Sequence, residues 1–439
     1  AMEWSTALML LLGTLMFLMA LGLPVAFAFL GVNILGAAVF LGGEAGLSQL
    51  PRNAMASLAT FTLAPIPLFV AMGEILFHTG VAFRAIEAVD RLVSRVPGRL
   101  SVVSVLGGTL FSSLSGSTLA NTAVLGGLLL PDMLKRGYHP AIAMGPIMAT
   151  GGIAMLIPPS ALAVLLGSLA GISISKLLIA GIIPGLMMSV IFLAYVVGRC
   201  YFTPSLAPRD EAVVTLTPWE RWRPFLINVV PLLGLFAVVV GSILAGWATP
   251  TESAAVGFVG SVVAAVAYRS LSIRALVKAL RATAKVSVMI LFIIVASVTF
   301  SQILAFSGAT DGLLKTIDGS TISLMATLVI MLAILLLLGA FMDQVSMVMI
   351  TLPFFIPLAG LQGIDLLWLG VLMLIAMEVS FTTPPFGLLL YVMKAVAPPS
   401  ISMRQIWSAA LPFIGLELLV LAALVLFPGL ALWLPSLAG

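Results

Sequence analysis

The sequence predicts an all-α polytopic membrane protein with two inverted-topology repeats, each containing a re-entrant helical hairpin and a broken helix. Three observations support this class. Of the 439 residues, 62% are hydrophobic and 8% are charged, whereas about 25% are charged in an ordinary soluble domain. Apolar stretches of about 18 residues or more, long enough to span a bilayer, recur along the whole chain. Landmarks of the first half return in the second half at offsets between 223 and 228 residues.

The repeat is carried by prolines and glycines that interrupt apolar segments. Two copies with interruptions at matching places are typical of secondary transporters, whose binding sites form at the interrupted helices. The matching landmarks are Pro24 with Pro250, Gly31 with Gly257, Gly80 with Gly308, Pro158-Pro159 with Pro384-Pro385, and Pro184 with Pro412.

Charge and motifs exclude several other classes. The net charge of +4 does not indicate nucleic-acid binding, because the basic residues lie in short loops, where Lys and Arg mark the cytoplasmic side of a membrane. The single cysteine, Cys200, excludes an internal disulfide. No phosphate loop and no H-E-x-x-H motif occur, which argues against an ATP-driven pump and an intramembrane metalloprotease. Residues 5–23 lack a basic leader and a cleavage site, so we expect a retained helix there.

Each half contains a stretch too long for one straight transmembrane helix of about 20 residues. Residues 100–131 carry no charge and have basic flanks, which predicts a hairpin that enters from the cytoplasm and returns there. Residues 319–364 carry one charge, Asp343, near the middle and have acidic flanks, which predicts a hairpin from the opposite side. The two repeats are therefore expected to be inverted.

This arrangement sets the expected orientation. Both termini are predicted to be periplasmic, and all Lys and Arg except Arg52, Lys176 and Lys315 then lie on the cytoplasmic side. Basic residues at helical spacing in residues 270–285 predict an amphipathic helix on the cytoplasmic interface, with residues 47–58 as its outer counterpart. The predicted parts are a first repeat at 1–198 (hairpin about 100–131, broken helix about 140–175), a cytoplasmic linker at 199–224, and a second repeat at 225–439 (hairpin about 320–360, broken helix about 366–393).

The middle of the first hairpin is rich in hydroxyl groups. Residues 112–122 combine serines and threonines with Gly116 and Asn121. Hydroxyl and carbonyl oxygens suit a small hard cation, and helix N-termini beyond a turn favour an anion. The alternative is close helix packing through small residues.

A break is predicted in the uncharged residues 140–175. Gly151-Gly152 and Pro158-Pro159 interrupt the helix, since proline removes a donor and clashes with the preceding turn. Irregular backbone at membrane depth survives only where it is buried in protein or lines a cavity. The alternative is a single helix kinked at proline.

The second half repeats both features with acidic residues. Asp343 lies in the middle of the hairpin, and an intramembrane carboxylate indicates a functional site unless it lies near an interface. Thr382 and Thr383 precede the second proline pair, so their hydroxyls can face a cavity. Glu378 either binds a ligand or pairs with polar groups of the neighbouring break. Glu74 and Glu417 are expected to be buried hydrogen-bond partners, Glu252 to begin a helix, and His78 and His139 to be ordinary loop or cap residues.

Taken in order, these motifs resemble the large membrane subunit of a tripartite ATP-independent periplasmic (TRAP) transporter of the DctM type. The resemblance covers essentially the full length. It rests on residues 22–27, Pro67–Phe69 with Gly73-Glu74, Ser115–Asn121, Ile157–Ser160, Thr249–Glu252, Met342-Asp343, and Glu378 through Pro385.

The resemblance implies a non-enzymatic, Na⁺-coupled carrier of organic acid anions in the bacterial inner membrane, using two or more sodium ions. It implies an elevator mechanism, as in other members of the ion-transporter superfamily. The implied partners are a small four-helix membrane subunit (Q-type), expected here as a separate chain, and a periplasmic substrate-binding protein (P-type). The remaining alternatives are a conventional Na⁺- or H⁺-coupled anion carrier that works without a binding protein, and an ion channel.

The resemblance also implies sites by position. One sodium site would use Ser115, Gly116, Asn121, Gly151, Gly152 and Pro158. A second would use Gly339, Asp343, Thr382 and Thr383. The anion would lie between them, near Ser117, Thr118, Asn121, Ser160, Gln344, Ser346 and Pro385.

Overall fold

The computed structural model describes residues 2–209, 215–385 and 387–439, and the regular elements in these ranges are helices, with no strand. Seven helical segments within them are long and apolar enough to cross a membrane. The predicted all-α membrane class is confirmed. Residues 210–214 of the predicted linker and Phe386 of the second predicted break lie outside the described residues.

The helices of the first half run from α1 to α11. In chain order they are α1 (Trp4–Ala20), α2 (Val25–Phe40), α3 (Glu44–Leu58), α4 (Pro65–His78), α5 (Val81–Leu92), α6 (Arg99–Ser115), α7 (Thr118–Lys135), α8 (Pro140–Gly152), α9 (Ala161–Ala170), α10 (Ile174–Ala180) and α11 (Ile182–Phe202).

The helices of the second half run from α12 to α22. They are α12 (Pro218–Asn228), α13 (Val230–Leu244), α14 (Pro250–Ala267), α15 (Ile273–Phe306), α16 (Ala309–Asp318), α17 (Leu324–Gly339), α18 (Gln344–Gln362), α19 (Leu366–Thr382), α20 (Leu388–Val396), α21 (Met403–Leu426) and α22 (Gly429–Ser436).

The start of α14 shows how the sequence fixes a helix end. The Thr249 hydroxyl accepts a hydrogen bond from Glu252 N at 3.3 Å, and the Glu252 carboxylate accepts one from Thr249 N at 2.7 Å, which together form a capping box. Pro250 occupies the first helical position, where no backbone N–H is needed. The expectation that Glu252 begins a helix is confirmed.

The structure corrects one predicted element. Residues 270–285 do not form a separate interfacial helix, because α15 runs without interruption from Ile273 to Phe306 over 34 residues. No glycine or proline interrupts it. In the first half, by contrast, the corresponding stretch is divided by Pro65 and a 3₁₀ turn at Phe61–Leu63, so α3 and α4 remain separate.

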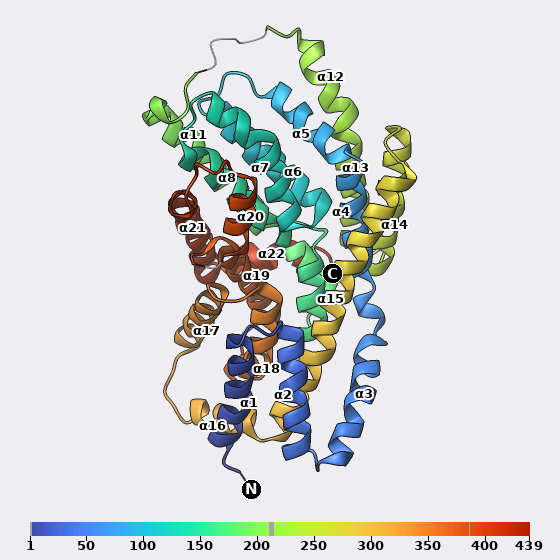
Figure 1. Cartoon of the computed structure of the whole chain (residues 1–439), viewed down its shortest axis with the longest axis vertical. Helices are drawn as coiled ribbons and strands as arrows, with labels where there is room; N and C mark the ends of the chain where they lie inside the picture. Colours follow the sequence, from blue (N-terminus) through green and yellow to red (C-terminus); the bar gives the residue numbers. More distant parts are fainter. Residues whose placement is uncertain (1, 210–214, 386) are drawn as a thin grey trace.

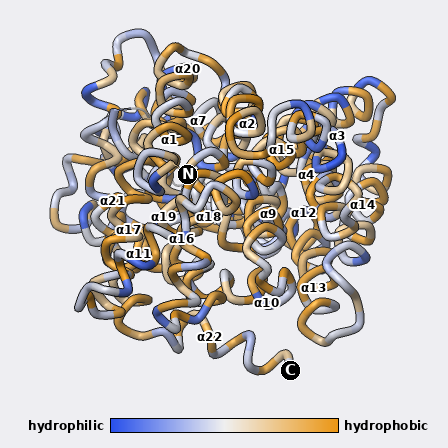
Figure 2. Tube along the Cα trace, turned by 90° about the horizontal axis from the view of Figure 1, so that it is seen from below, coloured by the Kyte–Doolittle hydropathy of each residue, from blue (hydrophilic) through white to orange (hydrophobic). Residues whose placement is uncertain are grey.

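The helices form two groups that lie side by side. α2, α4, α13, α14 and α15 pack on one another, and α6 to α8 pack with α19, α20 and α21, with α17 packed on α19. Figure 2 shows α3, α4, α13, α14 and α15 on one side of the molecule and α11, α17, α19 and α21 on the other. In Figure 1, α2 and α15 run beside each other, and the Asn33 Nδ2 on α2 donates to Ala296 O on α15 at 2.7 Å.

The two halves pack on each other reciprocally. Helices follow in the same order in residues 4–202 and 230–426. α2 packs on α15 as its counterpart α14 packs on α4, and α7 packs on α20 as α18 packs on α9. Such exchanged pairs are what a pseudo-two-fold relation between two repeats would produce.

Candidate functional site

The first hairpin turns at a glycine. α6 ends at Ser115 and α7 begins at Thr118, so Gly116 and Ser117 alone connect them. Gly116 has a φ of 59°, a left-handed conformation that residues with a Cβ rarely adopt. Ser117 caps α7 and accepts a hydrogen bond from Ala120 N at 3.3 Å. Two residues suffice because glycine supplies the backbone conformation and serine supplies the cap.

Hydrogen bonds around Asn121 tie this hairpin to α8. The Asn121 Nδ2 donates to Gly108 O at 3.0 Å and to Ser112 Oγ at 2.5 Å. It also lies 3.2 Å from Thr150 O, to which Ser112 Oγ donates at 3.0 Å. The Asn121 Oδ1 and the Thr122 Oγ1 are buried and have no hydrogen-bond partner among the described residues. An unmatched buried acceptor is unfavourable, so both oxygens are suited to a cation.

The break after α8 touches the hairpin turn. α8 ends at Gly152, a 3₁₀ turn (η2) follows at Ile153–Met155, and α9 begins at Ala161. The peptide bond between Pro158 and Pro159 is cis, and Ser160 caps α9. A Cβ on Gly116 would lie 2.7 Å from Pro159 O. The interrupted helix and the hairpin turn are thus in direct backbone contact.

The second hairpin turns at an aspartate cap. α17 ends at Gly339 and α18 begins at Gln344. The Asp343 carboxylate accepts hydrogen bonds from Ser346 N, at 3.2 Å, and from Ser346 Oγ. Asp343 is exposed, whereas Gln344 and Ser346 are buried. The carboxylate in the middle of the predicted hairpin therefore lies at its turn and at the surface of the described chain.

The break after α19 touches this second turn. The Gln344 Nε2 donates to Ser380 Oγ at 2.9 Å, and a Cβ on Gly339 would lie 2.1 Å from Ser380 Cβ. The hydroxyls of Thr382 and Thr383 donate back to Val379 O at 3.3 Å and 2.7 Å, as hydroxyls on helices often do. The peptide bond that joins the second proline pair is also cis.

The two breaks meet at a glycine pair. A Cβ on Gly151 would lie 2.4 Å from Thr122 Oγ1 and 3.0 Å from Leu389 Cδ1 on α20. A Cβ on Gly152 would lie 2.3 Å from Glu378 Cγ on α19. The two hairpin turns and the two helix breaks therefore form one continuous cluster, which is assembled from both halves of the chain.

The predicted site residues differ in exposure. Those that are at least partly exposed lie at the turns and at the second proline pair, and they are Gly116, Ser117, Asp343, Thr383 and Pro385. The buried ones are Ser115, Thr118, Asn121, Gly151, Gly152, Pro158, Ser160, Gly339, Gln344, Ser346 and Thr382. In this conformation, most of the residues predicted to bind the anion are covered by protein.

Three polar residues of the cluster are not among the predicted site residues. Ser112, Thr150 and Ser380 are buried and make the hydrogen bonds that join hairpins to broken helices. Ser112 stands in the hydroxyl-rich run, and Thr150 directly precedes the glycine pair. Ser112 and Ser380 lie within recognised motifs and Thr150 lies next to one, but the bonding partner of each lies far away in sequence.

The intramembrane glutamates separate into two kinds. Glu74 was expected to be a buried hydrogen-bond partner; it is half-buried and pairs with His78 Nε2 at 3.1 Å, one turn later on α4. Glu417 was expected to have a hydrogen-bond partner, and this prediction is wrong: none of its carboxylate oxygens, nor those of Glu378, has a partner among the described residues. Both side chains are completely buried.

The cluster fits a cation bound by neutral oxygens. Among the described residues, no group of three or more His, Cys, Asp or Glu could hold a metal ion. Transporters of sodium instead use carbonyls freed by helix breaks. Asn121 Oδ1 and Thr122 Oγ1 are available side-chain acceptors without charge, and Thr122 Oγ1 lies beside the break at Gly151.

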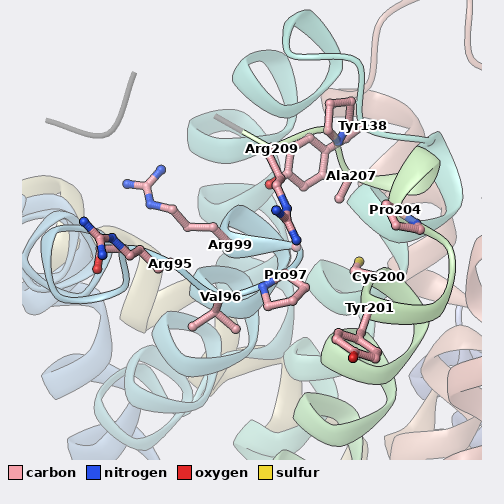
Figure 3. Close-up of a pocket in the computed structure, with 13 residues that line it drawn as sticks. Arg95, Val96, Pro97, Arg99, Tyr138, Cys200, Tyr201, Pro204, Ala207 and Arg209 are labelled. Carbon is pink, nitrogen blue, oxygen red and sulfur yellow. The ribbon is translucent and has the colours of Figure 1, made fainter. Parts of the chain in front are cut away.

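A separate basic cavity lies in the loops before α6 and after α11. Its volume is about 370 Å³, and its lining includes Arg95, Arg99, Tyr138, Cys200 and Arg209 (Figure 3). None of the predicted site residues lines it. Its arginines belong to loops predicted to be cytoplasmic, where an excess of basic residues is expected.

Comparison with known proteins agrees with this architecture. The family model for the DctM component of tripartite ATP-independent periplasmic transporters matches residues 12–430. The C4-dicarboxylate TRAP transporter large permease DctM of Pseudomonas aeruginosa is 33% identical over 385 residues, covering 86% of this chain and 87% of that protein. The 2,3-diketo-L-gulonate large permease YiaN of Escherichia coli is 33% identical, covering 89% and 90%. The sialic acid large permease SiaM of Vibrio cholerae is 29% identical, covering 95% of each.

Solved structures support the fold alone. The YdaH transporter of Alcanivorax borkumensis superposes with a TM-score of 0.59 at 17% identity, covering 91% of this chain and 95% of that one. With a family model matched over nearly its whole length and relatives of similar size, this chain belongs to the DctM family of TRAP transporter large permeases.

Proposed function

We propose that this chain carries out Na⁺-coupled uptake of an organic acid anion across the bacterial inner membrane, by an elevator mechanism. The observation that carries the proposal is the meeting of two interrupted helices, one from each half, at Gly151-Gly152 and Glu378. Irregular backbone in a membrane core is tolerated only where it is buried in protein or lines a cavity, and paired breaks are the arrangement that secondary transporters use for binding.

The geometry of the second turn supports coupling between a cation and an anion. Helix N-termini attract anions, but the amino end of α18 already holds the Asp343 carboxylate. An organic anion approaching this turn would be repelled by that charge. A sodium ion bound beside Asp343 would cancel the repulsion, so each ligand would strengthen the binding of the other.

The packing between the two helix groups supports movement of one against the other. Gly73 of α4 lies directly against the backbone of Ser115 at the first turn, so at this point the two groups meet without a side chain of α4 between them. Together with the reciprocal packing of the two halves, this favours a pseudo-two-fold carrier whose hairpins and breaks, as one unit, slide along α4 and α15.

The relatives support the class of substrate and the partners. Their names refer to C4-dicarboxylates, sialic acid and 2,3-diketo-L-gulonate, all of which are organic acids. Membership in the tripartite family supports a small membrane subunit and a periplasmic substrate-binding protein as partners.

Sodium binding is testable on the purified chain before any transport is measured. The thermal unfolding midpoint in detergent should rise with NaCl and not with equal KCl, because a ligand that binds the folded state stabilises it by mass action. Asp343→Asn should weaken this dependence, whereas Glu44→Gln, on an exposed residue of α3, should retain it. A midpoint that responds equally to both salts would overturn the sodium assignment.

A further inference from the structure

The basic cavity before α6 has arginines in its lining but, among the residues that the structure describes, no Asp or Glu. One of its arginines, Arg99, is paired with Asp90 at 2.7 Å. Arg95 and Arg209 form no ion pair or side-chain hydrogen bond with another described residue. Figure 3 shows the Arg209 side chain reaching from the loop after α11 toward Pro97. A hollow of about 370 Å³ with two such guanidinium groups suits a phosphate, because a guanidinium can bind two phosphate oxygens at once.

An apolar groove continues directly from this cavity. Ser94, Arg95 and Val96 line both spaces. The groove has a volume of about 500 Å³, and its other lining residues are all aliphatic: Leu92, Val93, Val102, Leu106, Leu193 and Val197. Two of them lie one turn apart on α6 and two lie one turn apart on α11, so the groove follows both helices for about 6 Å. The combined space is therefore charged at one end and apolar at the other.

Aromatic side chains indicate that the cavity lies at the level of lipid head groups. Tyr201 lines the cavity and is 66% exposed, and α12 carries Trp219 and Trp222, which are also exposed. Arg221 of the same helix donates a hydrogen bond to Ser94 Oγ, so α12 is tied to the residue at which cavity and groove join. Exposed Trp and Tyr are typical of the boundary between membrane and water.

We propose that the cavity and the groove together bind one anionic phospholipid. Its phosphate would lie between the guanidinium groups of Arg95 and Arg209, and the first part of an acyl chain would lie in the groove beside Leu106. Basic pockets between transmembrane helices on the cytoplasmic side bind anionic head groups in this way. None of the residues predicted to bind sodium or the transported anion lines this space, so the site is separate from the cluster of hairpins and breaks.

The two ends of the space select against other occupants. A zwitterionic phospholipid would bring a cationic amine to a cavity whose described lining offers arginines and no carboxylate. A small soluble acid could use the arginines, but it would leave the aliphatic groove unoccupied. Only a molecule with an anionic head and an apolar chain satisfies both ends.

Native mass spectrometry of the purified full chain tests the proposal. After removal of bound lipid, the wild type should retain one dioleoyl phosphatidylglycerol in preference to dioleoyl phosphatidylcholine. The Arg95→Gln/Arg209→Gln double variant should bind phosphatidylglycerol about 25-fold more weakly, about fivefold for each cation lost. Arg274→Gln/Lys278→Gln removes the same charge from exposed positions of α15 that line neither space, and it should bind like the wild type.

Equal retention of both lipids by the wild type would overturn the proposal whatever the variants do. So would an equal loss of binding in the two double variants, because it would reflect general attraction to basic surface charge.

A second variant and a soluble competitor separate a lipid from a free anion. Leu106→Trp, at a residue 39% exposed in the groove, should weaken phosphatidylglycerol binding with the arginines intact. Glycerol phosphate, which has the phosphate but no acyl chain, should not displace the lipid at equal concentration. Binding of glycerol phosphate as tight as that of the intact lipid, with no effect of Leu106→Trp, would make the cavity a site for soluble anions and refute the lipid assignment.

Discussion

The contact between α4 and the first hairpin turn should be the most sensitive place in the molecule to a single methyl group. Gly73 packs so closely that a Cβ there would lie 1.8 Å from Ser115 O, 2.6 Å from its carbonyl carbon and 2.8 Å from its Cα. All three are backbone atoms, so no side-chain rotation can relieve the clash. Gly73→Ala must separate the turn from α4.

The expected magnitude follows from these distances. Carbon and oxygen atoms of packed backbones stay about 3.3 Å apart or more, so the turn must withdraw by about 1.5 Å. Overpacking of this kind costs about 1–3 kcal/mol. Because ~1.4 kcal/mol changes an equilibrium constant tenfold, the population of this conformation should fall about 5- to 150-fold relative to any conformation in which the two surfaces have separated.

Two assays measure the consequence. Sodium-dependent uptake by Gly73→Ala should fall about fivefold or more, because the transport cycle passes through the disfavoured conformation. In a Cys200→Ser background, Ser117→Cys at the turn should react faster with a membrane-impermeant maleimide when Gly73→Ala is also present.

Gly127→Ala is the matched control for this substitution. Gly127 is also a helical glycine, lies on α7 of the hairpin that Gly73 contacts, and has no atom within 4 Å of its Cβ position. If Gly73→Ala showed wild-type uptake and labelling, indistinguishable from those of Gly127→Ala, the idea that the turn must fit against α4 would be refuted.

Three further substitutions probe the cluster. Asp343→Ala should abolish most Na⁺-dependent uptake at normal expression, since the proposed cation loses its charged partner; full uptake would exclude Asp343 from a sodium site. Asn121→Ala should lower the apparent sodium affinity about tenfold, as for the loss of ~1.4 kcal/mol of polar interaction, and an unchanged sodium dependence would place the ion elsewhere. Gly116→Val should block uptake, because its backbone has a φ of 59° and faces Pro159 O, and wild-type uptake would show that the turn can relax without loss of function.

Local chemistry explains why some features of this fold could be predicted. Gly116 within a run of hydroxyls marks a turn because few other residues adopt its conformation, and the Thr249-Pro250-Thr251-Glu252 sequence marks a helix start through its own hydrogen bonds. These signals act over about four residues, so the sequence carries them without reference to the rest of the fold.

Features that depend on distant residues were not predictable in the same way. α15 is continuous because no glycine or proline interrupts it. The amphipathic pattern in residues 270–285 instead led to the prediction of a separate helix. The bond from Trp368 Nε1 to Leu424 O, which joins α19 to α21, links residues 56 apart, and the bond from Gln344 to Ser380 joins residues 36 apart. Neither has a local signature.

The most direct test of the proposed function is uptake by proteoliposomes containing this chain and its small partner subunit. A panel of organic acids would be offered with the cognate binding protein, with and without an inward Na⁺ gradient. We predict saturable uptake of one class of acid that requires both the gradient and the binding protein. Uptake that needs the gradient but not the binding protein would make the chain a conventional carrier. Flux that neither saturates nor responds to the gradient would contradict the account and indicate a channel.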